Sequence, residues 1–269
     1  MNREYKAKKA VFFDIDGTLY DRQDPRLVPE SAKKAIQLLQ KNGHLAIICT
    51  GRCDCMVEEY LRNLQFDGYI FGCGTNLVFN NEELVYEKLP TDKIKRLMNI
   101  CKKHEAVPIF EGKYELYVPD EKTSIDGGLV YRFYSQFIKL SPLVDEQIEV
   151  SKMMARMMNR TPKTLEAFYK DLEDEGMQIF DHGDALEMVE KGYGKDAGIE
   201  RLINELGIKK ENTIAFGDSP NDLSMLDYVE TGIAMGNAKE EVLDSCIYKT
   251  DAVYEDGIYR ACEKLGLFK

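Results

Sequence analysis

The sequence predicts an α/β protein whose core is a doubly wound parallel sheet, interrupted by a separate α+β domain. Both ends of the chain alternate short apolar runs with helical patterns, and acidic residues follow several of those runs. The middle of the chain instead places strand patterns next to each other, as in antiparallel hairpins. The length of 269 residues also exceeds the ~100–150 residues of one typical domain.

The first eighty residues predict strand, helix, strand, helix and strand in that order. The strands are short and apolar throughout, as in a sheet covered on both faces. The first helical pattern has Pro29 near its start and Gly43 as its stop. The predicted strands are residues 10–14, 45–49 and 69–71, and the predicted helices are residues 32–39 and 56–64.

The last seventy-five residues return to the same alternation. A helical stripe closed by Gly207 precedes two apolar strands, and a final helix follows them. These elements are a helix over 199–206, strands over 213–216 and 232–235, and a helix over 258–265.

The middle predicts an insert over residues 83–190, which leaves residues 1–82 and 191–269 as the core. Its patterns are hairpins over 77–86 and 108–118, helices over 92–103 and 163–173, and strands over 178–180 and 186–189. The methionine-rich run 152–158 is ambiguous, because methionine favours helices but Asn159–Pro162 bounds the run early. We predict a strand there, whose methionines either pack in a core or form a binding face.

Composition excludes several classes of partner. A formal net charge of −11 argues against nucleic acid or an anionic membrane, since phosphate backbones are bound by Lys and Arg. No apolar run approaches the ~20 residues that span a bilayer, and the N-terminus lacks a signal-peptide core. Seven cysteines without a C-x-x-C pair indicate reduced thiols and a cytoplasmic protein, although Cys53 and Cys55 could bind a metal. Oligomeric state is not predictable from these features.

Acidic residues follow two predicted strands. Asp14 and Asp16 lie at the end of the first, two positions apart and so on one side of an extended chain. Gly217–Asp222 follows the strand over 213–216. Each has a plainer interpretation, because Asp16-Gly17 could simply form a turn and Ser219 to Asp222 a capping box.

Two further segments could bind an anion. Thr50-Gly51-Arg52 joins a strand to a helix. The threonine hydroxyl, the glycine amide and the helix N-terminus could form an anion-binding site, or Thr50 could simply cap the helix. Lys195 precedes a core helix and alone would be a surface lysine. Strand ends of one parallel sheet meet at one edge, so these segments predict a shared pocket. Four aspartates there against one lysine require a cation, and all-oxygen ligands indicate Mg²⁺.

Together these segments resemble the four motifs of the haloacid dehalogenase superfamily: D-x-D-G-T, T-G-R, a lysine and G-D-x-x-N-D. Met235–Ala238 and Glu255–Gly257 resemble its Cof-type branch of sugar-phosphate hydrolases. The resemblance implies a Rossmann-like core of that superfamily's fold and a type B cap in the C2 position, which agrees with the site of the insert. The chain departs at Cys73-Gly74-Thr75, where relatives often have Asn-Gly-Ala, and this weakens substrate inference from that loop.

The resemblance also implies roles for individual residues in a phosphatase of small phosphorylated metabolites. Asp14 would attack the phosphoryl group to form an aspartyl-phosphate, and Asp16 would act as acid and then as base. Asp14, Asp218 and the Asp16 carbonyl would bind Mg²⁺. The phosphoryl group would be held by Thr50, Gly51 and Lys195, with Arg52, Asn221 and Asp222 assisting around the substrate and the metal.

Two other functions stay open on the sequence. A phosphomutase could share this type of cap, although the compact Gly217–Asp222 motif is closer to the hydrolase form. A metabolite-binding protein without activity would be expected to have lost an aspartate or the lysine, and this chain retains them.

Overall fold

The computed structural model describes residues 8–21, 27–119, 138–143, 149–183 and 185–268. The chain divides into two compact units, and no helix in the described ranges is long and apolar enough to cross a membrane. The first unit is Met1–Gly51, Glu59–Val85 and Gly194–Lys269, and the second is Arg52–Glu58 and Tyr86–Tyr193. The division into a core and an insert stays a prediction, with the core over residues 1–82 and 191–269 and the insert over residues 83–190.

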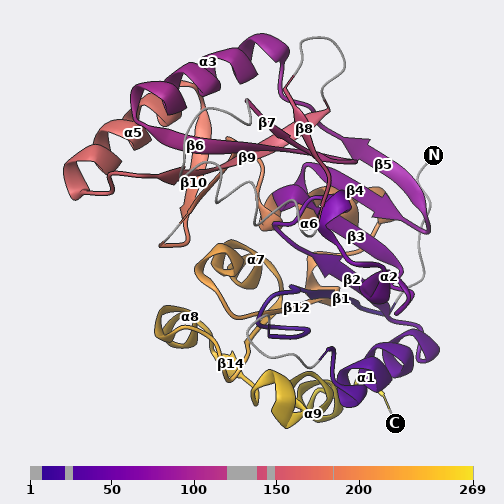
Figure 1. Cartoon of the computed structure of the whole chain (residues 1–269). Coiled ribbons are helices and arrows are strands. Elements are labelled where there is room, and N and C mark those ends of the chain that lie inside the picture. The colour runs from indigo at the N-terminus through magenta and orange to yellow at the C-terminus, as the bar shows by residue number, and fades with distance from the viewer. Residues whose placement is uncertain (1–7, 22–26, 120–137, 144–148, 184, 269) are drawn as a thin grey trace. The chain divides into compact units, whose positions relative to one another are not determined.

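The first unit is built on an eight-stranded sheet in the order β14-β13-β12-β1-β2-β3-β4-β5 (Figure 1). The strands from β14 to β3 are parallel, and β4 runs antiparallel to β3. The predicted α/β class with a parallel core sheet is therefore confirmed. The strands are β1 (Ala10–Phe13), β2 (Leu45–Cys49), β3 (Gly68–Phe71), β4 (Asn76–Phe79), β5 (Glu82–Tyr86), β12 (Thr213–Gly217), β13 (Thr231–Ala234) and β14 (Tyr248–Lys249).

The strand order contains a topological switch point at β1. From β1 the chain moves outward through β2 and β3, and it later returns beside β1 at β12 and moves outward on the other side. Ligands of open α/β sheets bind beyond the carboxyl ends of the strands at such a point. The end of β1 is therefore the place in this sheet where a site is expected.

Helices cover both faces of the first unit's sheet. On one face, α6 packs on α7 and buries Ile199 and Leu202 against Phe12 of β1. Elsewhere in the unit α1 packs against α9, as Figure 1 shows. Phe13 and Phe216 stack at 5.2 Å between neighbouring strands, and such a pair adds about 0.5–1.5 kcal/mol beyond burial. The helices are α1 (Glu30–Lys41), α2 (Glu59–Arg62), α6 (Lys195–Leu206), α7 (Leu223–Tyr228), α8 (Glu240–Ser245) and α9 (Gly257–Lys264).

The second unit contains a six-stranded mixed sheet in the order β10-β11-β9-β6-β7-β8, and its described residues include two 13-residue helices. Met153 of β9 and Met188 of β11 lie in its apolar core. The strand predicted over 152–158 is confirmed, and Met153 and Met157 are core residues. The elements are α3 (Thr91–Lys103), β6 (Ala106–Gly112), β7 (Leu116–Val118), β8 (Leu140–Pro142), β9 (Val150–Met157), α5 (Pro162–Asp174), β10 (Met177–Asp181) and β11 (Leu186–Glu190).

One predicted helix is wrong in extent. In place of a helix over 56–64 the structure has a 3₁₀ turn, Asp54–Met56, an extended Val57 and the four-residue α2. Cys55 and Met56 pack on an apolar cluster of the second unit that includes Ile109. The apolar residues at helical spacing therefore do not form one face of one helix, because those before Glu59 belong to the second unit and those after it to the first. The helical pattern is misleading here.

A buried charge cluster lies within the second unit's sheet. Lys152 on β9 is paired with Glu187 on β11 and lies 3.2 Å from Glu111 on β6. The three side chains are at most 5% exposed. Glu187 also contacts His182 at 3.0 Å. Lys152 therefore compensates two carboxylates that would otherwise be buried beside each other.

We predict that Lys152→Met lowers the free energy of unfolding by about 3–5 kcal/mol, because it leaves two uncompensated buried carboxylates. Lys103→Met is the matched control, since Lys103 pairs with Asp171 at the surface and should contribute under about 1 kcal/mol. Denaturant unfolding of both variants measures the difference. Equal stabilities of the two variants would contradict this assignment.

Candidate active site

The sheet brings two predicted site residues together at its carboxyl edge. Asp14 follows β1 and Asp218 follows β12, and the two strands are parallel neighbours with Phe13 opposite Phe216. The Asp14 amide donates to the Phe216 carbonyl at 3.1 Å, so the pairing continues to the end of the strands. On its other side β1 pairs with β2, which ends just before Thr50.

Lys195 joins this edge from the start of α6. The Nζ atom of Lys195 donates to Oδ1 of Asp14 at 2.7 Å and to Oδ1 of Asp222. The start of α6 packs closely on the loop after β3, where a Cβ on Gly74 would lie 2.6 Å from the Gly194 carbonyl. Lys195, Asp14 and Asp222 are 1%, 4% and 0% exposed, so this is a buried charge cluster rather than a surface lysine.

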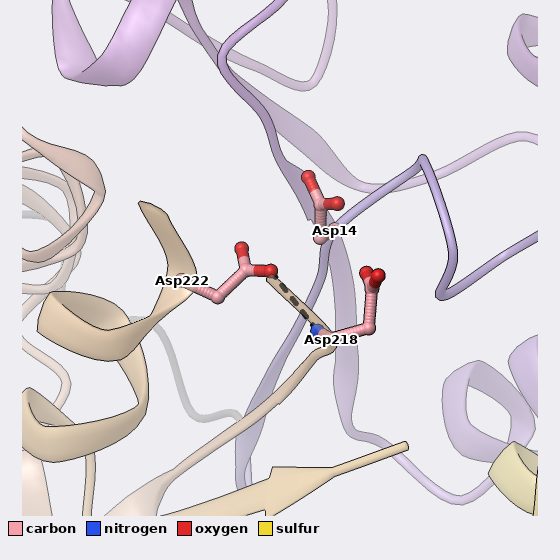
Figure 2. A group of neighbouring side chains, drawn as sticks. All are labelled: Asp14, Asp218 and Asp222. Carbon is pink, nitrogen blue, oxygen red and sulfur yellow. Dashed lines mark hydrogen bonds between the residues drawn. The ribbon is translucent and has the colours of Figure 1, made fainter. Parts of the chain in front are cut away.

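Asp222 is held by hydrogen bonds on both carboxylate oxygens. Its Oδ2 accepts from the backbone N–H groups of Asp218 and Ser219 at 3.0 Å each, and its Oδ1 accepts from Lys195. Figure 2 shows the bond between Asp222 and the Asp218 amide. These bonds fix the turn after β12 and, with it, the direction of the Asp218 side chain.

Three carboxylates form a potential metal site. One oxygen from each of Asp14, Asp218 and Asp222 lies within 4.8 Å of the others, and Figure 2 shows the Asp14 and Asp222 side chains directed into the same space. If all three were ionised, Lys195 would leave two negative charges uncompensated. Carboxylate oxygens suit hard divalent cations such as Mg²⁺, so the residues present fit such a cation.

Two carboxyl groups of the cluster have raised pKa values. Burial, followed by the charge of Asp222, raises the pKa of Asp14 to about 7, although Lys195 acts in the opposite direction. Burial and the charges of Asp14 and Asp222 raise the pKa of Asp218 to about 8. This environment thus favours the protonated form of both carboxyl groups, and a bound cation would favour their ionisation.

The other predicted site residues lie near the same edge or in the second unit. Asp16 is half-buried, forms a backbone bridge with Tyr20 and adds to the rise in the pKa of Asp14. Asn221 accepts a hydrogen bond from Ser219. The structure groups Arg52 with the second unit, where it is paired with Glu58.

Thr50 and Gly51 lie at the end of β2. Thr50 is 1% exposed, and its amide donates to Ile70 of β3 at 2.9 Å. Its carbonyl accepts from the Cys73 amide at 3.1 Å. Cys73 has a left-handed backbone (φ +54°), a conformation that asparagine adopts more readily than cysteine.

Sequence reasoning missed one polar residue of the site. Thr18 donates its hydroxyl to Oδ1 of Asp218 at 3.2 Å and is fully buried. The residue belongs to the D-x-D-G-T motif, so its position was visible, but its partner two hundred residues away was not.

We predict that Asp218→Asn stabilises the metal-free protein at pH 8 by about 1–3 kcal/mol, because it removes a charge that burial disfavours and retains an acceptor for Thr18. The folded-state pKa of about 8 lies above the ordinary 3.8, so the folded protein binds the extra proton between these values. Wild-type stability from this group is therefore complete below about pH 4 and is lost as the pH rises to 8. Thermal unfolding of both proteins in EDTA should show the full gain at pH 8 and a clearly smaller gain at pH 5. An equal gain at both pH values would contradict this prediction.

The chain matches the haloacid dehalogenase-like hydrolase family over residues 11–262. It is 33% identical to the Bacillus subtilis (strain 168) protein named "Putative phosphatase YkrA" over 97% of this chain and 99% of that one. It is 26% identical to 5-amino-6-(5-phospho-D-ribitylamino)uracil phosphatase YcsE of the same organism, with 97% of each chain covered.

Solved structures agree with the fold. The haloacid dehalogenase subclass IIB sugar phosphatase BT4131 superposes with a TM-score of 0.81 at 29% identity, over 97% of this chain and 100% of that chain. The sequence motifs, the buried cluster at the switch point and the second mixed sheet all accord with this group. The chain belongs to the haloacid dehalogenase-like hydrolase family and, within it, to the phosphatases of the Cof-type class IIB branch.

Proposed function

We propose that the protein is a Mg²⁺-dependent phosphatase that hydrolyses small phosphorylated metabolites, sugar phosphates or similar compounds, through an aspartyl-phosphate on Asp14. The observation that carries this proposal is the buried contact of Lys195 with Asp14, beside Asp218 and Asp222 at the sheet's switch point. A lysine in this place can both orient the Asp14 carboxylate and donate hydrogen bonds to the phosphoryl oxygens.

Relatives support the class of substrate. YcsE is named for a phosphorylated ribitylamino compound, BT4131 is described as a sugar phosphatase, and a Methanobrevibacter smithii relative at 27% identity is named phosphoglycolate phosphatase. All three names describe small phosphorylated compounds or their sugar class. We propose this class for the present chain, with residues 83–190 as the domain that selects among its members.

Asp14 is the proposed nucleophile. Its carboxylate oxygen attacks phosphorus, the bond to the leaving alkoxide breaks, and the phosphoryl group is carried on Asp14 until water displaces it. Only the ionised carboxylate can attack. Lys195 favours that form, and its contact with Oδ1 fixes the orientation of the carboxylate.

Asp16 is the proposed general acid and base. Its protonated carboxyl gives a proton to the leaving oxygen in the first step, and the resulting carboxylate takes a proton from the attacking water in the second. The backbone bridge between Asp16 and Tyr20 holds the turn that carries this side chain.

Asp14, Asp218 and the backbone carbonyl of Asp16 are the proposed ligands of Mg²⁺. When bound, the cation offsets the charge of the carboxylates and of the incoming phosphate dianion, which repel each other strongly in a buried site. Asp222 is already engaged by Lys195 and two backbone amides, which favours a positioning role over direct ligation.

The remaining residues hold the phosphoryl oxygens or support the groups that do. Lys195, the Thr50 hydroxyl and the Gly51 amide are the proposed donors to the phosphoryl group. Asn221 and Arg52 are proposed to assist at the metal and the substrate, respectively. Positioned donors and charge supply most of the barrier reduction in phosphoryl transfer.

We predict Mg²⁺-dependent phosphate release from at least one compound in a panel of sugar phosphates, nucleotides and flavin mononucleotide. Asp14→Asn should lower kcat by at least ~10³-fold, because it removes the nucleophile. Asp92→Asn, an exposed aspartate on α3, is the matched control and should retain the wild-type rate. Release that persists in EDTA, or in Asp14→Asn, would contradict the mechanism.

We predict that Asp16→Asn separates the two chemical steps. With 4-nitrophenyl phosphate, whose leaving group needs no proton, the variant should release one equivalent of nitrophenol rapidly and then turn over ~10²–10⁴-fold more slowly. Rapid-quench measurement detects the burst, and acid-quenched protein should carry the phosphoryl group. If Asp16→Asn turned over both this substrate and a sugar phosphate at the wild-type rate, Asp16 would be neither the acid nor the base.

A further inference from the structure

One loop contacts both segments that carry the proposed metal ligands. Residues 235–239, here called the 235–239 loop, follow β13. The Met235 amide donates to the Gly217 carbonyl and the Lys239 amide donates to the Asp218 carbonyl, each at 3.0 Å. These two bonds hold the loop on the segment that ends β12.

Asn237 extends the same loop to the turn after β1. Its side-chain Nδ2 donates to the Gly17 carbonyl at 2.7 Å. Its Oδ1 accepts from the Val253 amide at 3.0 Å. The Asn237 side chain therefore connects its own loop to the segment at Val253 and to the Gly17 turn, which lies 220 positions away, and both ends of its amide are used.

The Gly17 backbone lies directly against Asp218. Gly17 has a left-handed backbone (φ +83°), and a Cβ at this position would lie 2.1 Å from Oδ2 of Asp218. Thr18, the next residue, donates its hydroxyl to the other oxygen of the same carboxylate. The position of the Gly17–Thr18 turn therefore determines where the Asp218 carboxylate can lie.

The 235–239 loop thus fixes both sides of this contact. Two backbone bonds hold the loop to Gly217 and Asp218, and the Asn237 side chain holds the Gly17 turn. Asn237 is itself exposed, so its removal leaves no cavity and should change global stability little. Its main effect should be on the spacing between the turn after β1 and the end of β12.

We propose that Asn237 is a positioning residue that sets the separation of the Gly17 turn from Asp218 and thereby tunes the affinity of the site for a divalent cation. This inference rests on the proposed function, because it presumes that Asp14 and Asp218 bind Mg²⁺. Groups that orient metal ligands from outside the ligand set typically change affinity or activity by ~10–100-fold when they are removed.

The test is Mg²⁺ binding to the metal-free full-length chain by isothermal titration calorimetry, for wild type and Asn237→Ala. We expect the Kd for Mg²⁺ to rise about 10-fold in Asn237→Ala. Phosphatase assays should show the same shift in the Mg²⁺ concentration that gives half-maximal rate, with kcat at saturating Mg²⁺ closer to that of wild type. The thermal unfolding midpoint in EDTA should be nearly unchanged.

Asn42→Ala is the matched control. The side-chain amide of Asn42 also donates to a backbone carbonyl, that of Leu38 at 2.8 Å, but this bond lies at the end of α1. The control should bind Mg²⁺ as wild type does. A Kd for Asn237→Ala within twofold of wild type would overturn the inference and leave the proposed function intact. Wild-type protein that neither binds Mg²⁺ nor releases phosphate would instead overturn the proposed function, and this inference with it.

Discussion

The buried contacts of Lys195 with Asp14 and Asp222 are the interaction on which the rest of the site depends. They join the ends of β1 and β12 to the start of α6, three segments that are distant in the sequence. A single buried lysine against three carboxylates leaves an excess of negative charge, and burial, with this excess added to it, raises the pKa values of Asp14 and Asp218. Bound protons or a divalent cation would offset this charge, so the cluster fits such a cation.

Much of the fold could be predicted from the sequence because the patterns that specify it are local. Buried parallel strands are short apolar runs, and the acids that end β1 and follow β12 are visible as interruptions of those runs. The left-handed Gly207 ends α6 where the sequence predicts it. Even the methionine-rich β9 could be assigned, because Asn159–Pro162 leaves too little length for a helix. The general topology of doubly wound sheets also predicts that the strand ends and Lys195 lie together.

The features that could not be predicted depend on contacts between distant residues. The segment 56–64 has a helical pattern, but at its start Met56, with the preceding Cys55, packs on apolar residues of the second unit's sheet, whose strands lie far along the chain. β8 and β14 have two or three residues each and carry no periodic signal. The bonds of Thr18 with Asp218 and of Asn237 with Gly17 span 200 and 220 positions, and a hydroxyl or an amide in a loop does not indicate its partner. The motifs thus point to the groups proposed to act, whereas the bonds that position these groups appear only in the fold.

The most direct test of the central claim is a crystal structure of the protein grown with Mg²⁺ and beryllium fluoride, which mimics a phosphoryl group on a carboxylate. We expect a beryllium trifluoride adduct on Asp14, with Lys195 in contact with its fluorine atoms and Mg²⁺ bound to Asp14 and Asp218. An adduct on another residue, or Mg²⁺ bound away from Asp14 and Asp218, would contradict it.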